Sequence, residues 1–373
     1  MEYNRHTEED PRFLTEQIIT YLGNKRALLG FLGTAVEQVR RDLQKEKLDI
    51  VDLFSGSGVV SRFFKRYADN LFSNDLEAYS ATINRCYLTN RQDVDFSALE
   101  RIYATLKARL DTEPLRTGFL SELYAPKDDQ NIRRGERVFY TTRNAAYLDT
   151  ARQLLEDVAE PYRTYLLAPL LYEASVHNNT SGVFKGFYKN SQTGVGQFGG
   201  DGRNALQRIT GDIELKMPVF SNFSCRVHLF QRDAAALADE LPPVDLVYLD
   251  PPYNQHPYGS NYFMLNLIDS YRRPEEISPV SGIPKGWNKS QFNQKQSARA
   301  GMEQLCNRLN ARYLLISFSS DGFLSREEMV GFLSKIGEVK VLDKEYNTFR
   351  GSRNLNNRDL HVKEYLYLVK TQR

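Results

Sequence analysis

The sequence predicts an α/β protein built around a doubly wound, mainly parallel sheet. Short apolar runs bounded by Gly, Asp or Ser recur along the chain, which is typical of strands buried on both faces. Helical patterns follow most of these runs, and this alternation is typical of a doubly wound sheet. The chain has 373 residues, 41% of them hydrophobic, so it is long enough to bury such a core.

The expected elements follow one another in a regular order. Strands are expected at residues 48–54, 71–75, 225–230, 245–250 and 313–319. Helices are expected at residues 59–68, 76–90, 232–240 and 325–336. At the end of the chain, "VKVLDKEYNTFRGS" and "LHVKEYLYLVK" are expected to form a hairpin at one side of the sheet.

The alternation of strands and helices breaks between about residues 91 and 223. This region begins with helical sequence at 95–110 and 148–177, and then becomes irregular, with six glycines in "FKGFYKNSQTGVGQFGGDGRNALQR". A block of this size is too long for a simple crossover between parallel strands. We therefore expect residues 91–223 to be an inserted, mainly helical and irregular subdomain. Residues 1–90 and 224–373 would then form the main domain.

Composition narrows the class of protein. Lys plus Arg (49) nearly cancel Asp plus Glu (47), so net charge alone does not indicate nucleic-acid binding. The three cysteines, Cys86, Cys225 and Cys306, form no CxxC pair, which argues against a disulfide framework or a structural zinc site. The N-terminus is polar and no apolar run of about 18 residues occurs, so we expect neither a signal peptide nor a membrane span. A cytoplasmic setting fits these features.

Three expected strands end in a carboxylate. "DLVYLDPPY" places Asp250 directly before two prolines, which cannot continue a sheet ladder. Asp75 and Asp233 follow the strands at 71–75 and 225–230. "VDLFSGSG" places Gly56 and Gly58 between a strand and a helix, where a ligand can approach the backbone closely, although many proteins use such glycines only for a tight turn. Together these residues predict a ligand site at the carboxyl edge of the sheet, although Asp75 and Asp233 also suit helix N-caps.

The combination resembles the S-adenosylmethionine-dependent DNA adenine N6-methyltransferases of the α-group, or D12 class, which includes Dam-like and FokI-type enzymes. "YLGNKR" (21–26) is similar to the N-terminal cofactor motif of that family, "DLFSGSG" to its glycine loop and "DPPY" to its catalytic motif. "SNYFMLN" (260–266) and "LLISFSSDG" (314–322) are similar to later motifs. One departure is Gly23-Asn24, where Dam-like enzymes tend to have two glycines. The resemblance implies a Rossmann-like methyltransferase sheet with a target-recognition subdomain inserted before the DPPY strand.

The resemblance also implies roles for particular residues. Tyr21 and Lys25 match an aromatic residue and a lysine that contact the cofactor. Asp75 matches the ribose ligand, Asp233 the adenine ligand, and Asp52 the acid that faces the methionine amino group. The implied cofactor-binding set is Tyr21, Lys25, Asp52, Phe54, Gly56, Gly58, Asp75 and Asp233, and the implied catalytic set is Asp250, Pro251, Pro252 and Tyr253. No metal is expected.

The chemistry of adenine methylation suits the catalytic set. The lone pair of the exocyclic amine is delocalised into the ring, so the nitrogen is a poor nucleophile. If Asp250 and the carbonyl of Pro251 accept hydrogen bonds from this amine, the lone pair can point at the methyl donor, and the prolines hold that carbonyl in place. The target base must leave the duplex, and Tyr253 is the expected stacking platform. Tyr346 or Phe349 is expected on the other face of the base.

Basic residues gather in two polar segments where DNA contact is expected. The candidate DNA-binding residues are Lys185, Lys189, Arg203, Lys285, Lys289 and Lys295, which would neutralise phosphates. An alternative interpretation is that both segments are only solvated loops. Lys25 could likewise be an exposed residue on a helix surface. His177 and His256 are read as structural residues, because a lone histidine more often makes a structural hydrogen bond and this reaction needs no metal.

The sequence therefore predicts a site-specific DNA adenine N6-methyltransferase of the restriction-modification type. The expected partners are duplex DNA and a cognate restriction endonuclease, and a monomer is the default state. Alternatives are methylation of RNA adenine or of cytosine N4, a non-catalytic DNA-binding module of the same fold, and a NAD-linked dehydrogenase. The last lacks support, because residues 56–61 read GSGVVS and not GxGxxG.

Overall fold

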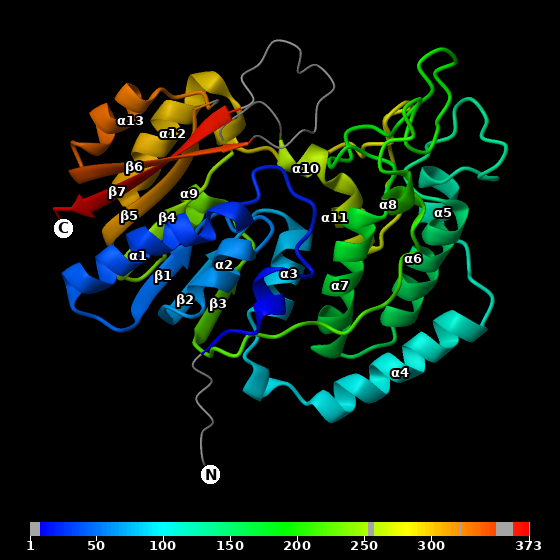
Figure 1. Ribbon diagram of the computed structural model, residues 1–373, viewed down its shortest axis with the longest axis horizontal. Helices are drawn as coiled ribbons and strands as arrows, with labels where there is room; N and C mark the ends of the chain where they lie inside the picture. Colours follow the sequence, from blue (N-terminus) through cyan, green and yellow to red (C-terminus); the bar gives the residue numbers. More distant parts are fainter. Residues whose placement is uncertain (1–7, 253–256, 321, 348–360, 373) are drawn as a thin grey trace.

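The computed structural model, which describes residues 8–252, 257–320, 322–347 and 361–372, contains a mixed seven-stranded sheet (Figure 1). The strand order is β3-β2-β1-β4-β5-β7-β6. The strands are β1 (Leu48–Asp52), β2 (Ala68–Asn74), β3 (Arg226–Phe230), β4 (Val244–Leu249), β5 (Ala311–Ser319), β6 (Gly337–Asn347) and β7 (His361–Thr371). Strands β1 to β5 are parallel, whereas β7 is antiparallel to both β5 and β6. The expected strands and the closing hairpin are confirmed.

The order of the strands reverses between β1 and β4. From β1 the chain first builds outward through β2 and β3, and then returns to place β4 on the other side of β1. In open α/β sheets, ligands bind outside the carboxyl ends of the strands at such a reversal. Asp52 and Asp250, at the ends of β1 and β4, flank this point.

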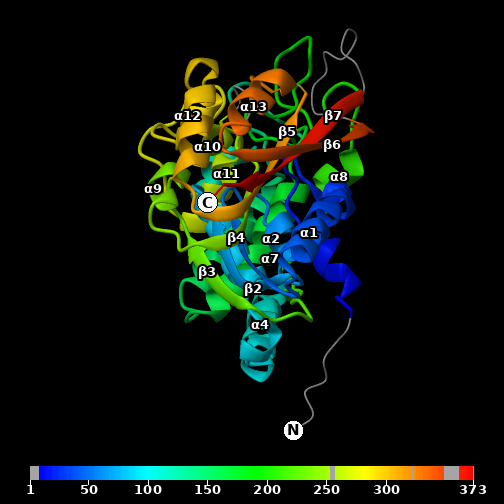
Figure 2. The same ribbon diagram turned by 90° about the vertical axis from the view of Figure 1, so that its left-hand side faces the viewer.

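Helices cover both faces of the sheet, as Figure 2 shows. Ile50 of β1 packs with α1 and α2 on one face, whereas its neighbour Val51 packs with α9, α12 and α13 on the other. This alternation is the period of two expected for a strand buried on both sides. The helices are α1 (Leu29–Leu43) and α2 (Val59–Phe64) on the first face, and α9 (Ala234–Ala238), α12 (Lys295–Arg308) and α13 (Arg326–Leu333) on the second. The doubly wound prediction is confirmed.

The expected helix at 59–68 is too long. Helix α2 ends at Phe64, and β2 begins at Ala68, which pairs with Leu48 of β1. The apolar residues after Phe64 fit a helical period equally well, but pairing with β1 satisfies their backbone groups in the sheet. Sheet pairing therefore overrides the local helical pattern.

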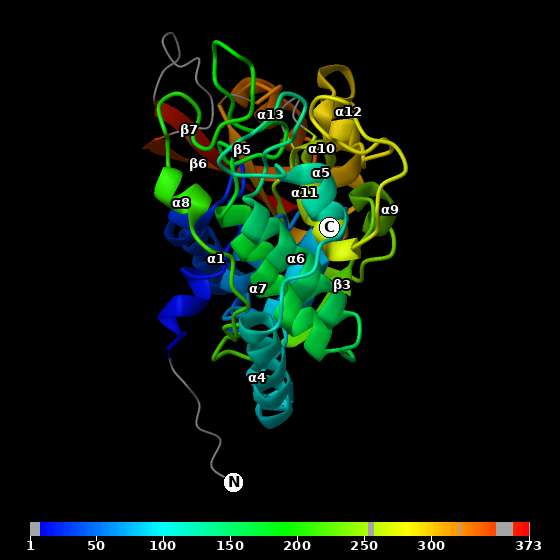
Figure 3. The ribbon, with the colours of Figure 1, turned by 90° about the vertical axis from the view of Figure 1, so that its right-hand side faces the viewer.

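Residues 91–223, all of which the structure describes, contain helices and loops and no strand. The helices are α4 (Phe96–Thr112), α5 (Phe119–Tyr124), α6 (Thr142–Leu155), α7 (Tyr162–Val176) and α8 (Leu206–Thr210). They form a lobe beside the sheet (Figures 1 and 3). The helical sequence expected at 148–177 is confirmed, and it belongs to two helices, α6 and α7. Pro161 precedes α7, at a position where the missing proline N–H costs no helical hydrogen bond.

The lobe shares its hydrophobic core with elements outside residues 91–223. Helix α7 packs against α3 (Ala78–Tyr87) and α11 (Phe263–Ser270), which lie outside residues 91–223. Buried Tyr79, Leu166 and Phe263 belong to this one core. The remaining elements are α10 (Tyr258–Asn261) and the short η1 (Pro11–Leu14), η2 (Arg26–Leu28), η3 (Arg91–Asp93) and η4 (Gln291–Asn293). None of the helices in the described part of the chain combines the length and the hydropathy of a membrane span.

Candidate active site

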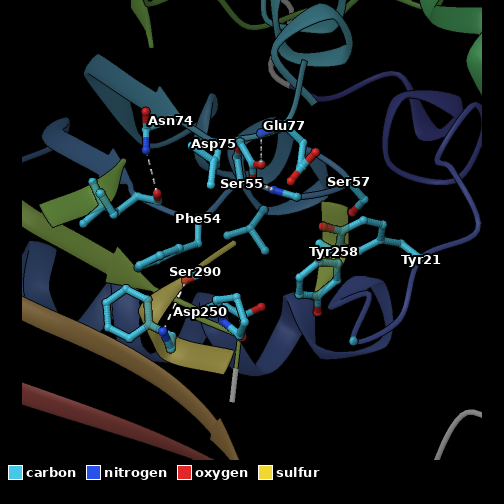
Figure 4. A pocket seen from close by; sticks show the side chains of 18 of the residues that line it. Tyr21, Phe54, Ser55, Ser57, Asn74, Asp75, Glu77, Asp250, Tyr258 and Ser290 are labelled. Atoms are coloured by element: carbon cyan, nitrogen blue, oxygen red, sulfur yellow. Dashed lines mark hydrogen bonds between the residues drawn. The ribbon is translucent and has the colours of Figure 1, made fainter. Parts of the chain in front are cut away.

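An open cavity lies beyond the carboxyl ends of the central strands, at the point where their order reverses (Figure 4). Its volume is about 860 Å³, counted with the solvent at its mouth, and ligand sites usually measure roughly 300–1,000 Å³. It is lined by residues 21–25, 53–57, 59–60, 74–77 and 232–234, by Tyr248, Asp250, Pro252, Tyr258 and Gly259, and by Asn288, Ser290, Phe292 and Asn293. Segments far apart in the sequence therefore meet at one cavity.

The glycine loop turns sharply from β1 into α2. Gly56 and Gly58 have φ angles of 52° and 75°, in the left-handed region that favours glycine. A Cβ atom on Gly56 would lie 2.8 Å from the ring of Tyr21, and one on Gly58 would lie 2.7 Å from the side-chain oxygen of Asn84. Gly56 lines the cavity, whereas Gly58 is buried beneath it. The tight turn is confirmed, and it leaves the cavity wall at Gly56 without a side chain.

Asp75 ties this loop to the end of β2. Its carboxylate accepts hydrogen bonds from the backbone N–H of Gly56 at 2.7 Å and of Glu77 at 2.9 Å. Burial raises the pKa of Asp75, although both hydrogen bonds oppose that change. Glu77, not Asp75, is the N-cap residue of α3. The N-cap interpretation of Asp75 is therefore wrong.

Asp233 caps helix α9 and also lines the cavity. Its Oδ1 accepts hydrogen bonds from the backbone N–H of Ala235 at 2.9 Å and of Ala236 at 3.1 Å. The capping interpretation is confirmed. A carboxylate has further lone pairs, so a ligand contact is compatible with the cap.

Asp52 is fully buried and does not line the cavity. Its Oδ2 accepts a hydrogen bond from the hydroxyl of Ser61 at 2.6 Å, and its Oδ1 has no hydrogen-bond partner among the described residues. Burial raises the pKa of Asp52 to about 7, and the nearby charge of Asp250 adds to the rise. The structure thus places Asp52 behind the wall formed by residues 53–57. Phe54 is in that wall, and its ring packs edge-on against Phe292 at 5.4 Å.

Asp250 stands at the end of β4 beside a buried ammonium group. Nζ of Lys25 lies 3.1 Å from Oδ1 of Asp250 and 3.2 Å from Oε1 of Glu364. The Lys25 side chain is only 3% exposed, so the interpretation as exposed helix surface is wrong. Burial raises the pKa of Asp250 to about 6; the Lys25 charge opposes this rise and the Glu364 charge adds to it.

Some predicted residues lie outside the described part of the chain. These are Tyr253, His256 and Phe349. Pro251 is buried, and Tyr346 lies in β6. His177 makes a structural contact, since its Nδ1 lies 2.7 Å from the carbonyl oxygen of Arg208.

A stack of tyrosines holds the N-terminal segment against the cavity. The Tyr21 ring stacks against Tyr258, at 4.9 Å and 13°, and against Tyr262, at 4.7 Å and 23°, and the Tyr258 and Tyr262 rings also stack on each other at 5.9 Å. The Tyr258 hydroxyl donates to the carbonyl oxygen of Leu22 at 3.1 Å, and the Leu22 N–H donates to the Tyr262 hydroxyl at 2.6 Å. Sequence reasoning missed Tyr258 and Tyr262. Their spacing of four residues on one helical face is a signal that points to paired aromatic side chains.

The polar segment at 282–299 contributes to the cavity, which the sequence did not indicate. Asn288, Ser290, Phe292 and Asn293 line it, and Asn288 donates a hydrogen bond to the carbonyl oxygen of Leu76 at 3.4 Å. No motif marks these residues, because they reach the cavity only through the folding of this segment.

The candidate DNA-binding residues are mostly exposed. Lys185, Arg203, Lys285, Lys289 and Lys295 are exposed, whereas Lys189 is half-buried with its ammonium 4.9 Å from the centre of the Phe187 ring. Lys285 forms an ion pair with Glu276, which lies outside the segment 282–299. This acid offsets one of the positive charges of the segment.

The comparison with known families agrees with this geometry. The family model of the D12 class N6 adenine-specific DNA methyltransferases matches residues 21–329. The chain belongs to this family. As a D12 methyltransferase it is an adenine-specific DNA methyltransferase, and this activity implies use of S-adenosylmethionine.

Several curated relatives of this D12 methyltransferase match it over most of its length. The chain is 31% identical over 363 residues to the type II methyltransferase M.CviAII of Paramecium bursaria Chlorella virus 1, covering 94% of the chain and 98% of that relative. It is 27% identical over 361 residues to the type II methyltransferase M.NlaIII of Neisseria lactamica, covering 94% and 99%. It is also 26% identical over 362 residues to the type II methyltransferase M.FokI of Planomicrobium okeanokoites, of which it spans 52%.

Proposed function

We propose that the protein methylates N6 of an adenine flipped out of a specific duplex DNA sequence, as the modification methylase of a restriction-modification system. One observation carries this proposal. The Asp250 carboxylate lines the same cavity as the glycine loop, Asp75 and Asp233. A methyl donor and an amine bound in this cavity would therefore be close to each other. Relatives of this chain are type II methyltransferases, which supports the restriction-modification role.

The residues of the cavity fit S-adenosylmethionine. Its wall is bare at Gly56, and Phe54 and Tyr21 supply flat apolar surfaces. Asp75 and Asp233 supply acceptors for the ribose hydroxyls and the adenine amine, respectively. Lys25 and Asp52 act through their charges, because both side chains are buried. S-adenosylmethionine, when bound there, supplies an electrophilic methyl group on a positively charged sulfur.

Asp250 and the two prolines prepare the amine for reaction. Asp250 accepts one N–H of the adenine amine and the carbonyl of Pro251 accepts the other, so the lone pair is released from the ring and directed at the donor. As the nitrogen–methyl bond would form and the methyl–sulfur bond break, the nitrogen would gain positive charge, which the Asp250 carboxylate would stabilise until the amine loses one of its protons. Tyr253 is the proposed stacking partner of the base, which cannot reach the cavity while it is paired in the duplex.

Basic side chains from two segments of the chain are proposed to hold the DNA. Lys185, Lys189 and Arg203 from the lobe and Lys285, Lys289 and Lys295 from the segment after α11 would contact phosphates. We propose that the protein acts as a monomer, since one site methylates one strand at a time, and that a cognate endonuclease recognises the same sequence.

Transfer of labelled methyl groups from S-adenosylmethionine to unmethylated genomic DNA tests this function. We expect label in N6-methyladenine with the wild type and none with Asp250→Ala, and sequencing of the marked positions then gives the target. Label in N4-methylcytosine, or in RNA only, would contradict the proposal. Flipping is tested separately with 2-aminopurine at the target position, whose fluorescence should rise when the protein binds.

A further inference from the structure

A buried carboxylate lies behind the catalytic strand, in a part of the chain that no motif marks. Glu364 is on β7, opposite Ser319 of β5, and its side chain is fully buried. It accepts a hydrogen bond from the hydroxyl of Ser317. Its Oε1 is 3.2 Å from the Lys25 ammonium, which on its other side is 3.1 Å from Asp250. One buried cation is thus shared by two carboxylates.

Stability alone does not explain this arrangement. Removing charges from water is costly, and a well-packed apolar cluster of similar volume is often at least as stable as a buried ion pair. A second carboxylate on the same ammonium adds to the cost, because the three charges together leave an excess negative charge. This cost favours a role for the cluster beyond stability.

We infer that Glu364 is a positioning residue that shares the Lys25 ammonium with Asp250, so that the Asp250 carboxylate keeps its strength as an acceptor for the adenine amine. The inference rests on the proposed role of Asp250. A cation paired with Asp250 alone would stabilise its charge and weaken it as an acceptor. Glu364 competes for the same ammonium and limits that effect.

The two oxygens of Asp250 can serve different partners, one the Lys25 ammonium and the other a ligand. Oδ1, which faces Lys25, is buried, whereas the side chain as a whole is 18% exposed. We assign Oδ2 as the acceptor for a ligand in the cavity. The other groups that influence the charge here are Asp52 at the end of β1 and the phenol of Tyr248 on β4.

The pH dependence of a single turnover tests the inference. Glu364→Gln keeps the shape and still accepts from Ser317, but removes the charge. Glu345→Gln, an exposed residue on the neighbouring strand β6, is the matched control. Methyl transfer is measured between pH 5 and 9 with DNA and S-adenosylmethionine saturating, and cofactor affinity is measured separately by calorimetry.

We expect a wild-type acidic limb with its midpoint near 6. In Glu364→Gln the midpoint should fall by about half a pH unit or more and the plateau rate by about tenfold or more. Cofactor affinity should stay within about threefold, since Glu364 does not line the cavity. Glu364→Asp should restore the midpoint, and Glu345→Gln should not move it. A rate loss with an unmoved midpoint, or no change at all, overturns the inference and indicates a purely structural role.

Further variants distinguish a failure of the proposed function from a failure of the inference about Glu364. Asp250→Asn in the same assay tests the proposed function: if it retains the wild-type rate, the role of Asp250 falls, and this inference falls with it. If Asp250→Asn is inactive and Glu364→Gln behaves as the wild type, only the inference fails. Should Glu364→Gln not fold, the double variant Lys25→Met/Glu364→Gln is compared with Lys25→Met, and its midpoint should be lower because the Glu364 charge is gone. Equal midpoints in these two variants overturn the inference.

Discussion

Substituting Asp52 by asparagine should stabilise the protein at pH 8 in the absence of cofactor. Asp52 is fully buried, and burial raises its pKa from 3.8 to about 7. Each pKa unit corresponds to about 1.4 kcal/mol, so keeping this carboxylate ionised in the folded state costs about 4 kcal/mol above pH 7. Asparagine has the same shape, and its side-chain oxygen can still accept the hydrogen bond from Ser61. Its NH2 group then takes the place of Oδ1, which has no hydrogen-bond partner among the described residues, and this unsatisfied buried group costs about 1–3 kcal/mol. The expected net gain is therefore about 1–3 kcal/mol.

The sign of the pH dependence follows from the raised pKa. A carboxyl group whose pKa is higher in the folded state than in the unfolded state destabilises the folded protein when it is ionised. For Asp52 this destabilisation is complete above pH 7 and nearly absent below about pH 4. At pH 5 the folded protein holds Asp52 mostly protonated, and the cost falls to about 1–2 kcal/mol. The advantage of Asp52→Asn should thus be present at pH 8 and absent at pH 5.

Urea unfolding followed by far-ultraviolet circular dichroism measures this difference. The wild type, Asp52→Asn and the exposed control Asp343→Asn are compared at pH 8 and pH 5. The control should match the wild type at both pH values. If Asp52→Asn is less stable than the wild type by the same amount at both, the carboxylate carries no ionic cost and the reasoning is refuted.

Three further predictions address the cavity and the DNA. Gly56→Ala would place a Cβ 2.8 Å from the Tyr21 ring at a φ of 52°, so calorimetry should show cofactor affinity at least about tenfold weaker; Gly331→Ala, with open space around it, is the control and should bind normally. Asp233→Ser keeps an N-cap side chain on α9, so the free energy of unfolding in urea should change by no more than about 0.5 kcal/mol. Cofactor affinity should fall about tenfold. Unchanged affinity would show that Asp233 only caps the helix. In DNA-binding titrations, Lys185→Gln should reduce by about 1 the slope of the logarithm of the binding constant against the logarithm of the salt concentration. An unchanged slope would show that Lys185 does not contact the DNA.

The ends of the strands were predictable from the sequence. Two prolines stop β4 at Asp250, and two glycines mark the turn after β1, because each of these residues has a strong local effect on the backbone. Since the carboxyl ends of parallel strands meet at one edge, these local signals also predicted that Asp75 and Asp250 line one cavity.

Features that depend on pairing between distant segments were not predictable. Glu364 and Lys25 are 339 residues apart in the chain and meet only because β7 inserts between β5 and β6. Asn288 reaches the cavity from a loop whose composition indicated only solvent or DNA contact. Helix α2 was predicted too long, because the local pattern does not show that Ala68 pairs with β1.

The central claim is that Asp250 acts in the chemical step. The most direct measurement is the single-turnover rate of adenine N6 methylation by Asp250→Asn, with DNA and S-adenosylmethionine affinities measured on the same preparation. We predict a rate at least about a hundredfold below that of the wild type, with both affinities within about threefold. A wild-type rate, or a loss explained entirely by weaker cofactor binding, would contradict this role of Asp250.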